Sequence, residues 1–164
     1  MTLSSRMLHQ PRKKYFVVYC LGAALVAALG SLALLSVVYF IITAANGAEP
    51  TGPEYSLGWV EFFGIAVFSP LIETALLVVM LRLLSRLPLQ PLTLAALAAI
   101  LWGCFHGLLF PMWFFGTVWS FFIFSCAYLT WRTHSEKLGY WAAALPHAIL
   151  NTVVFFAMAS GIVD

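Results

Sequence analysis

Residues 15–45 read YFVVYCLGAALVAALGSLALLSVVYFIITAA, an uninterrupted run without a charged side chain. A bilayer core about 30 Å thick is crossed by about 20 apolar residues, because an α-helix rises about 1.5 Å per residue. This run is therefore long enough to form a membrane-spanning helix. It is also about twice as long as the apolar core of a signal peptide, so we expect it to be retained as an anchor.

Four further apolar runs follow the first and use most of the remaining chain. They cover Leu57–Leu84, Leu92–Phe110, Trp113–Trp131 and Gly139–Val163. Overall, 63% of the residues are hydrophobic and 9% are charged, whereas roughly a quarter of a soluble domain is charged. The sequence therefore predicts an all-α, polytopic helical membrane protein with about five transmembrane helices. It leaves little room for a sizeable water-soluble domain.

The basic residues predict an orientation, because Lys and Arg are retained on the cytoplasmic side of a membrane. They are Arg6, Arg12, Lys13, Lys14, Arg82, Arg86, Arg132 and Lys137. If the amino terminus is cytoplasmic, all of them fall on one side of a cell membrane, and the acidic residues Glu49, Glu54 and Asp164 fall on the other. The net charge of +2 is then an inner fringe beside membrane lipids and does not indicate nucleic-acid binding.

This topology divides the chain into three segments. Residues 1–14 form a basic cytoplasmic segment, residues 15–56 form the first transmembrane helix and an external loop, and residues 57–164 form a four-helix core. Small residues in the first helix, Gly22, Ala23, Ala27 and Gly30, are spaced to let another helix approach closely.

Four polar side chains lie inside the apolar runs, where an ionisable group costs about 2.5 to 3.5 kcal/mol on insertion scales. They are Glu73, His106, His147 and Asn151. Counted from the cytoplasmic helix ends, they lie at depths of about 12 to 20 Å. His147 and Asn151 are four residues apart and share a helix face. Three helices therefore offer polar groups at a similar level in the membrane.

These residue types suit hydrolysis. A desolvated carboxylate such as Glu73 is a candidate general base for water, and His106 is a candidate to orient that water. His147 and Asn151 are candidate hydrogen-bond donors to an oxyanion. The structural alternative is that each side chain joins two helices by a hydrogen bond, which contributes about 0.6 kcal/mol on average.

Two other hydrolytic chemistries compete with this interpretation. Glutamate and histidine are zinc ligands, but the chain lacks a His-Glu-x-x-His helix. Ser69, Ser120 and Ser125 are present without a Gly-x-Ser-x-Gly turn.

The three cysteines lack paired spacing, and we expect them to be small apolar fillers. They are Cys20, Cys104 and Cys126. We therefore expect no metal and no organic cofactor.

The same residues form an ordered set of three motifs. They are Pro70-Leu71-Ile72-Glu73-Thr74, Trp102-Gly103-Cys104-Phe105-His106, and His147-Ala148-Ile149-Leu150-Asn151. The set resembles the CAAX protease and bacteriocin-processing (CPBP) family of glutamic intramembrane proteases, which includes the type II CAAX prenyl endopeptidases. The family motifs are Glu-Glu-x-x-x-Arg, Phe-x-x-x-His and His-x-x-x-Asn. The resemblance covers about residues 57–159.

The resemblance implies a fold and residue roles. It implies a CPBP-like four-helix core, in which Glu73 and His106 activate water while His147 and Asn151 stabilise the oxyanion. The expected activity is endopeptidase cleavage of a membrane-associated peptide or protein. Because the chain is short for the family, with one helix ahead of the core, prenylated substrates are not implied.

The chain departs from the family pattern in the first motif. Thr74 stands at the second glutamate and Val78 at the arginine. Arg82 is nine residues from Glu73, which places it on the opposite helix face. In the family pattern the two missing groups are four apart and suited to an ion pair, so losing both leaves no orphan charge.

Two non-hydrolytic alternatives stay open. The first is a catalytically inactive membrane scaffold or immunity-type protein of the same fold, which the incomplete first motif favours. The second is a small transporter or proton relay that uses Glu73 and the histidines, because ionisable groups inside membranes also mark ion pathways.

Overall fold

The computed structural model describes residues 11–47 and 57–160, and almost all of these residues are helical. The elements are η1 (Lys13–Tyr15), α2 (Phe16–Asn46), α3 (Trp59–Phe63), η2 (Gly64–Phe68), α4 (Ser69–Leu84), α5 (Pro91–Leu109), α6 (Pro111–Trp131) and α7 (Glu136–Ala159). No strand occurs within these ranges. Here η1 is a 3₁₀ turn, η2 is a π-helix, and α3, η2 and α4 follow one another as one rod.

Five helical stretches of the described chain are long and apolar enough to cross a membrane. Their outer surfaces carry large apolar side chains; Leu108 and Val60, for example, are more than four-fifths exposed. Such surfaces suit lipid as a solvent. The predicted all-α polytopic membrane fold is confirmed.

The helix ends agree with the predicted apolar runs to within a few residues. Pro91 and Pro111 begin α5 and α6, where the missing proline N–H has no helical partner to lose. Helix α7 begins at Glu136, earlier than predicted, because the Ser135 hydroxyl accepts a hydrogen bond from the Leu138 N–H at 3.1 Å and caps the helix.

Some predictions fall outside the described residues. They concern Arg6, Glu49, Glu54, Asp164, most of the basic segment 1–14, most of the external loop, and the end of the fifth run beyond Ser160.

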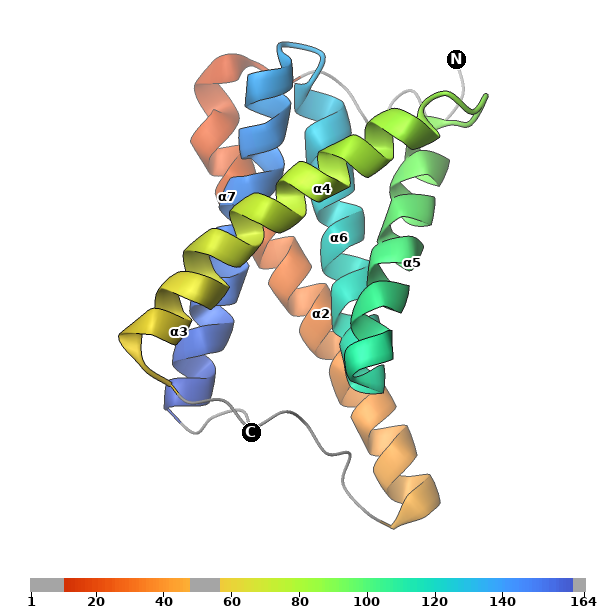
Figure 1. Ribbon diagram of the computed structural model, residues 1–164, viewed down its shortest axis with the longest axis vertical. Helices are drawn as coiled ribbons and strands as arrows, with labels where there is room; N and C mark the ends of the chain where they lie inside the picture. Colours follow the sequence, from red (N-terminus) through yellow and green to blue (C-terminus); the bar gives the residue numbers. More distant parts are fainter. Residues whose placement is uncertain (1–10, 48–56, 161–164) are drawn as a thin grey trace.

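Helix α6 lies at the centre of the bundle and packs against α5, α2 and α7. Figure 1 shows α4 crossing this group obliquely: α4 meets α5 at the turn that joins them and diverges from it toward α3. The amino-terminal half of α4 therefore approaches α7 while its other end stays beside α5.

Small residues let α2 approach α6, as predicted for part of the small-residue set. A Cβ on Gly30 would collide with the Trp119 side chain, and Ala27 is fully buried. The Trp119 indole donates to the Val26 carbonyl at 2.9 Å. Gly22, in contrast, has no neighbour near its missing Cβ. Gly22 therefore does not take part in this close approach.

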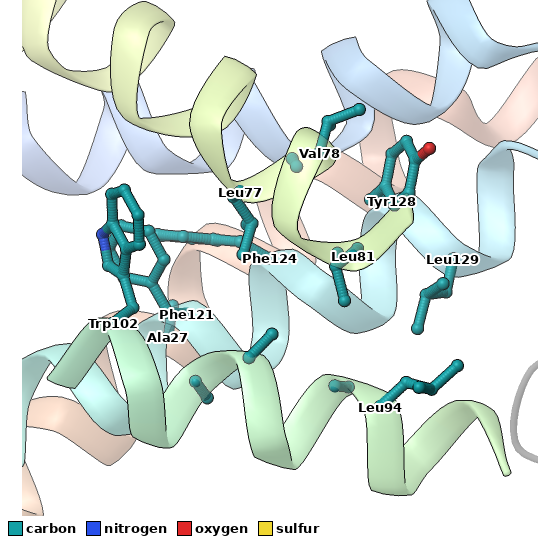
Figure 2. Packing of buried hydrophobic residues seen from close by; sticks show 14 residues of the cluster. Ala27, Leu77, Val78, Leu81, Leu94, Trp102, Phe121, Phe124, Tyr128 and Leu129 are labelled. Carbon is teal, nitrogen blue, oxygen red and sulfur yellow. The ribbon is translucent and has the colours of Figure 1, made fainter. Parts of the chain in front are cut away.

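The buried core fixes α4 against α6. Leu77 and Leu81 of α4 are fully buried together with Phe124 and Tyr128 of α6. Figure 2 shows Leu77 beside Phe124, with Trp102 of α5 close to the same layer. Because lipid tails are as apolar as these side chains, tight van der Waals packing stabilises the contact. This packing fixes the helix that carries Glu73.

Candidate functional site

A change of helix register precedes Glu73. The Ser69 N–H donates to the Gly64 carbonyl five residues back, which is the π-helical pattern, and Pro70 follows without an N–H. By itself, a proline such as Pro70 inside a long apolar run indicates a bend, because it removes one backbone donor. The structure instead places one π turn before Pro70, and α4 continues beyond it with Glu73 one turn further along.

The Glu73 carboxylate receives two neutral hydrogen-bond donors. The Ser69 hydroxyl, one turn earlier on the same helix, donates to Oε1. The Trp102 indole N–H of α5 donates to Oε2 at 3.4 Å. The Glu73 side chain remains 22% exposed, so the carboxylate is accessible as well as supported.

His106 reaches the same carboxylate oxygen from α5. Its Nε2 lies 3.7 Å from Glu73 Oε2, which is too long for a direct hydrogen bond. Its Nδ1 lies 3.1 Å from the Trp102 carbonyl oxygen. A carbonyl oxygen only accepts, so Nδ1 carries the hydrogen and, in the neutral ring, Nε2 presents a lone pair toward Glu73.

His147 approaches from α7 and is almost completely buried. Its Nε2 lies 3.8 Å from Glu73 Oε2. The ring stacks on Phe124 with centroids 4.8 Å apart and meets the Phe121 ring edge to face at 5.1 Å. Among the described residues, Nδ1 has no hydrogen-bond partner. Aromatic packing therefore sets the direction in which this imidazole points.

Asn151 does not join the other three predicted residues by a hydrogen bond. Its Nδ2 donates to the Ile65 carbonyl of the π-helix at 2.9 Å. The structure therefore brings Glu73, His106 and His147 together and places the Asn151 amide against the backbone just ahead of Glu73.

The departures from the family pattern lie in the helix interior. Thr74 is fully buried, its hydroxyl has no hydrogen-bond partner among the described residues, and Val78 is packed in the core. Arg82 lies away from Glu73, as predicted, and its guanidinium is 2.8 Å from the Glu136 carboxylate. No guanidinium supports Glu73 in the part of the chain that the structure describes.

Sequence reasoning missed several contributors to the site. Ser69 and Trp102 stand one helical turn before Glu73 and His106, and this four-residue spacing is a signal that could have found both. Phe121 contacts both histidine rings, at centroid distances of 5.9 Å and 5.1 Å. Nothing in the local sequence distinguishes Phe121 from the neighbouring aromatic residues of α6.

The site does not have the arrangement of a metal centre. Within residues 11–47 and 57–160, no group of three or more His, Cys, Asp or Glu side chains is placed to hold a metal ion. The three cysteines are free and lie on different helices. Two hollows are lined by apolar residues, one between α5 and α6 and one between α2 and α7, and neither includes Glu73 or a histidine.

No protein-family model, curated protein or solved structure matches the chain. The family resemblance therefore remains an expectation from the three motifs, and the functional argument rests on the arrangement of the side chains.

Proposed function

We propose that the chain is a glutamic-type intramembrane endopeptidase that hydrolyses a peptide bond in a membrane-associated substrate. Glu73 and His106 activate water, and His147 and Asn151 stabilise the oxyanion. One observation carries the proposal: two imidazole nitrogens from α5 and α7 face the same carboxylate oxygen of α4, at 3.7 and 3.8 Å. The resemblance of the three motifs to the CPBP family supports the same roles.

The hydrogen-bond pattern around His106 favours a bound water. Its Nε2 lone pair faces the Glu73 oxygen, and two acceptors at this distance repel unless a donor lies between them. A water that donates one hydrogen to each atom fits this separation. Its oxygen lone pairs then remain available to attack a carbonyl carbon.

The proposed reaction needs only these side chains and water. Glu73 takes one proton from water as the water oxygen bonds to the carbonyl carbon of the substrate. The tetrahedral intermediate then collapses, the C–N bond breaks, and the proton passes from Glu73 to the leaving nitrogen. The carboxylate is regenerated, and no metal or organic cofactor enters the scheme.

Stabilisation of the oxyanion is assigned to α7. A carboxylate facing Nε2 of His147 favours the tautomer with hydrogen on that nitrogen, which makes it a donor. The Asn151 amide has two N–H groups, and one of them donates to Ile65. We assign the second to the oxyanion. Preorganised donors in a site that excludes water act strongly on developing charge.

The proposed setting is a cell membrane with the amino terminus in the cytoplasm. The basic residues near the described helix ends fit this orientation, because they gather at one end of the bundle. Arg82 lies in the last turn of α4, Arg86 and Arg132 follow α4 and α6, and Lys137 lies in the first turn of α7. Cleavage would then take place toward the cytoplasmic half of the bilayer.

Cleavage of a peptide library by purified protein tests the proposal. We expect Glu73→Ala and His106→Ala to abolish cleavage, while Glu61→Gln, a change in the same membrane span outside the site, keeps it. If the two site variants cleave as fast as the unmodified protein, the peptidase proposal fails.

A catalytically inactive scaffold or immunity-type protein is the second candidate. The observation that favours it is the buried pair Thr74 and Val78, which replaces the family's charged support. Thermal unfolding separates the two candidates: residues kept for packing lower stability when replaced, whereas catalytic residues are often neutral or stabilising on removal. A clear loss of stability in Glu73→Gln, without any cleavage by the parent protein, would favour the scaffold.

A further inference from the structure

The π turn and Pro70 together leave the Ile65 carbonyl without its backbone donor. In an α-helix the Ile65 carbonyl would accept from the Ser69 N–H, but that N–H is donated to Gly64. In the π pattern it would accept from residue 70, which is Pro70 and has no N–H. An unpaired carbonyl inside a membrane costs several kcal/mol.

Asn151 supplies the missing donor through its Nδ2, at 2.9 Å from the Ile65 oxygen. We propose that Asn151 is a positioning residue: its hydrogen bond to Ile65 compensates for Pro70 and holds the π turn that directs Glu73 toward the two histidines. This goes beyond the assigned oxyanion role, because it uses the other N–H of the same amide. It rests on the geometry of the rod and not on the peptidase activity.

Both ends of the π turn are held by α7, which makes its register consequential. On one side, the Phe62 ring of α3 packs against the Phe155 ring of α7, with centroids 5.3 Å apart. On the other side, the Tyr140 hydroxyl donates to the Leu71 carbonyl of α4 at 2.9 Å. The π turn inserts one residue between these anchors, and one residue corresponds to about 100° of helix rotation. Without the turn, α3 and α4 could not both keep their contacts.

Glu73 lies only three residues beyond Pro70, so any change in the register of the helix at Pro70 also changes the direction of the Glu73 side chain. A rotation of this size would move its carboxylate away from His106 and His147. The π turn and the Asn151 hydrogen bond are thus both needed to bring Glu73, His106 and His147 together. Single π turns within α-helices are frequent at functional sites.

A stability cycle tests the compensation between Asn151 and Pro70. We expect Asn151→Ala to lower the folding equilibrium constant in detergent micelles roughly threefold to twentyfold, the range of interhelical hydrogen bonds in membranes. Adding Pro70→Ala restores an N–H for the Ile65 carbonyl, so the double variant should recover most of this loss. The matched control is Pro111→Ala, which removes a helix-start proline elsewhere and should leave the Asn151→Ala defect unchanged.

A second readout reports the position of Glu73 directly. A hydrophobic carbodiimide modifies protonated carboxylic acids, and mass spectrometry of the peptide that contains Glu73 gives the labelling rate at each pH. We expect Asn151→Ala to change this pH profile and the double variant with Pro70→Ala to return it to that of the unmodified protein. A general loss of stability would not be reversed in this way.

The inference is overturned if Pro70→Ala restores no more stability than Pro111→Ala does. It is equally overturned if the Glu73 labelling profile is the same in Asn151→Ala as in the unmodified protein. Neither measurement requires cleavage of a substrate, so a failure of the peptidase proposal and a failure of this inference are distinguishable.

Discussion

Glu73 and Glu136 lie near opposite ends of the region where α4 meets its neighbours, and their carboxylates are satisfied in different ways. Glu136 accepts from the Arg82 guanidinium and from the Tyr128 hydroxyl, both at 2.8 Å. It is therefore paired with a full positive charge and with a well-aligned neutral donor. Both donors meet the same oxygen, Oε2, so the position of this carboxylate is set by a cation and a hydroxyl together.

Glu73 has no such cation among the described residues. Its donors are the neutral groups of Ser69 and Trp102, and the imidazoles of His106 and His147 stand beyond direct hydrogen-bond distance. The carboxylate is held in place while one oxygen still faces two nitrogen atoms. This is an arrangement with room for a proton to be transferred.

The comparison teaches that polarity alone does not mark a reactive carboxylate. A carboxylate that is neutralised by a guanidinium joins helices and is a poor acceptor for another proton, because an opposite charge favours its ionised form. A carboxylate positioned by neutral donors, such as Glu73, has no guanidinium beside it. Variants of each glutamate and its partners therefore separate a structural role from a catalytic one.

The largest expected effect follows from Glu73→Gln. Loss of the proposed general base should lower the cleavage rate about 10²- to 10⁴-fold, while the thermal unfolding midpoint stays the same or rises. The measurement is peptide cleavage by purified protein alongside an unfolding scan. Glu136→Gln is the control and should keep its cleavage rate. A similar loss of activity in both variants would contradict the assignment of a catalytic role to Glu73 and a structural role to Glu136.

The second effect concerns the missing charged pair beside Glu73. Val78→Arg should destabilise the fold by about 3–5 kcal/mol, because it places an unpaired charge in the buried core. Thr74→Glu on the same helix face should recover part of this loss when the two changes are combined. Equilibrium unfolding of both single variants and the double variant measures the coupling. Additive losses in the double variant would show that these positions cannot support an ion pair.

Much of the fold was predictable from the sequence, because the membrane imposes a simple rule. A long apolar run must satisfy its own backbone groups, and helices are the only open-chain way to do so. All five predicted spans therefore correspond to helices. Depth counting likewise indicated that Glu73, His106 and His147 lie at one level, and the structure brings these three side chains together.

The remainder depended on contacts that no local pattern encodes. We attribute the π turn to the two contacts with α7 on either side of it, and Pro70 alone indicates a bend and not a change of register. Asn151 donates to the Ile65 carbonyl, which lacks a backbone donor because of that turn and Pro70. The sequence correctly marks the Asn151 amide as unusual within a membrane, but its partner is a backbone atom whose availability depends on tertiary structure.

The third effect concerns the hydrogen bond from Trp102 to the Glu73 carboxylate. Trp102→Phe gives the residue type of the family motif and removes the indole N–H that lies 3.4 Å from the carboxylate. A hydrogen bond to a charged group contributes about 1.5–3 kcal/mol, and this long one belongs at the low end, so we expect cleavage to fall about tenfold. Trp141→Phe on α7 is the control and should retain activity. Unchanged cleavage in Trp102→Phe would leave Ser69 as the effective support of Glu73.

The smallest effect is expected at the other glutamate. Tyr128→Phe removes one interhelical hydrogen bond to Glu136 but leaves the Arg82 contact in place. Such bonds contribute about 0.6 kcal/mol on average in membrane proteins, so the unfolding midpoint should fall slightly and the cleavage rate should not change. Unfolding scans and cleavage assays on the same preparation measure both quantities. A drop in the cleavage rate would mean that Glu136 and Glu73 are coupled through α4. An unchanged rate would show that the Glu136 carboxylate, already paired with the Arg82 guanidinium, contributes only to the joining of helices.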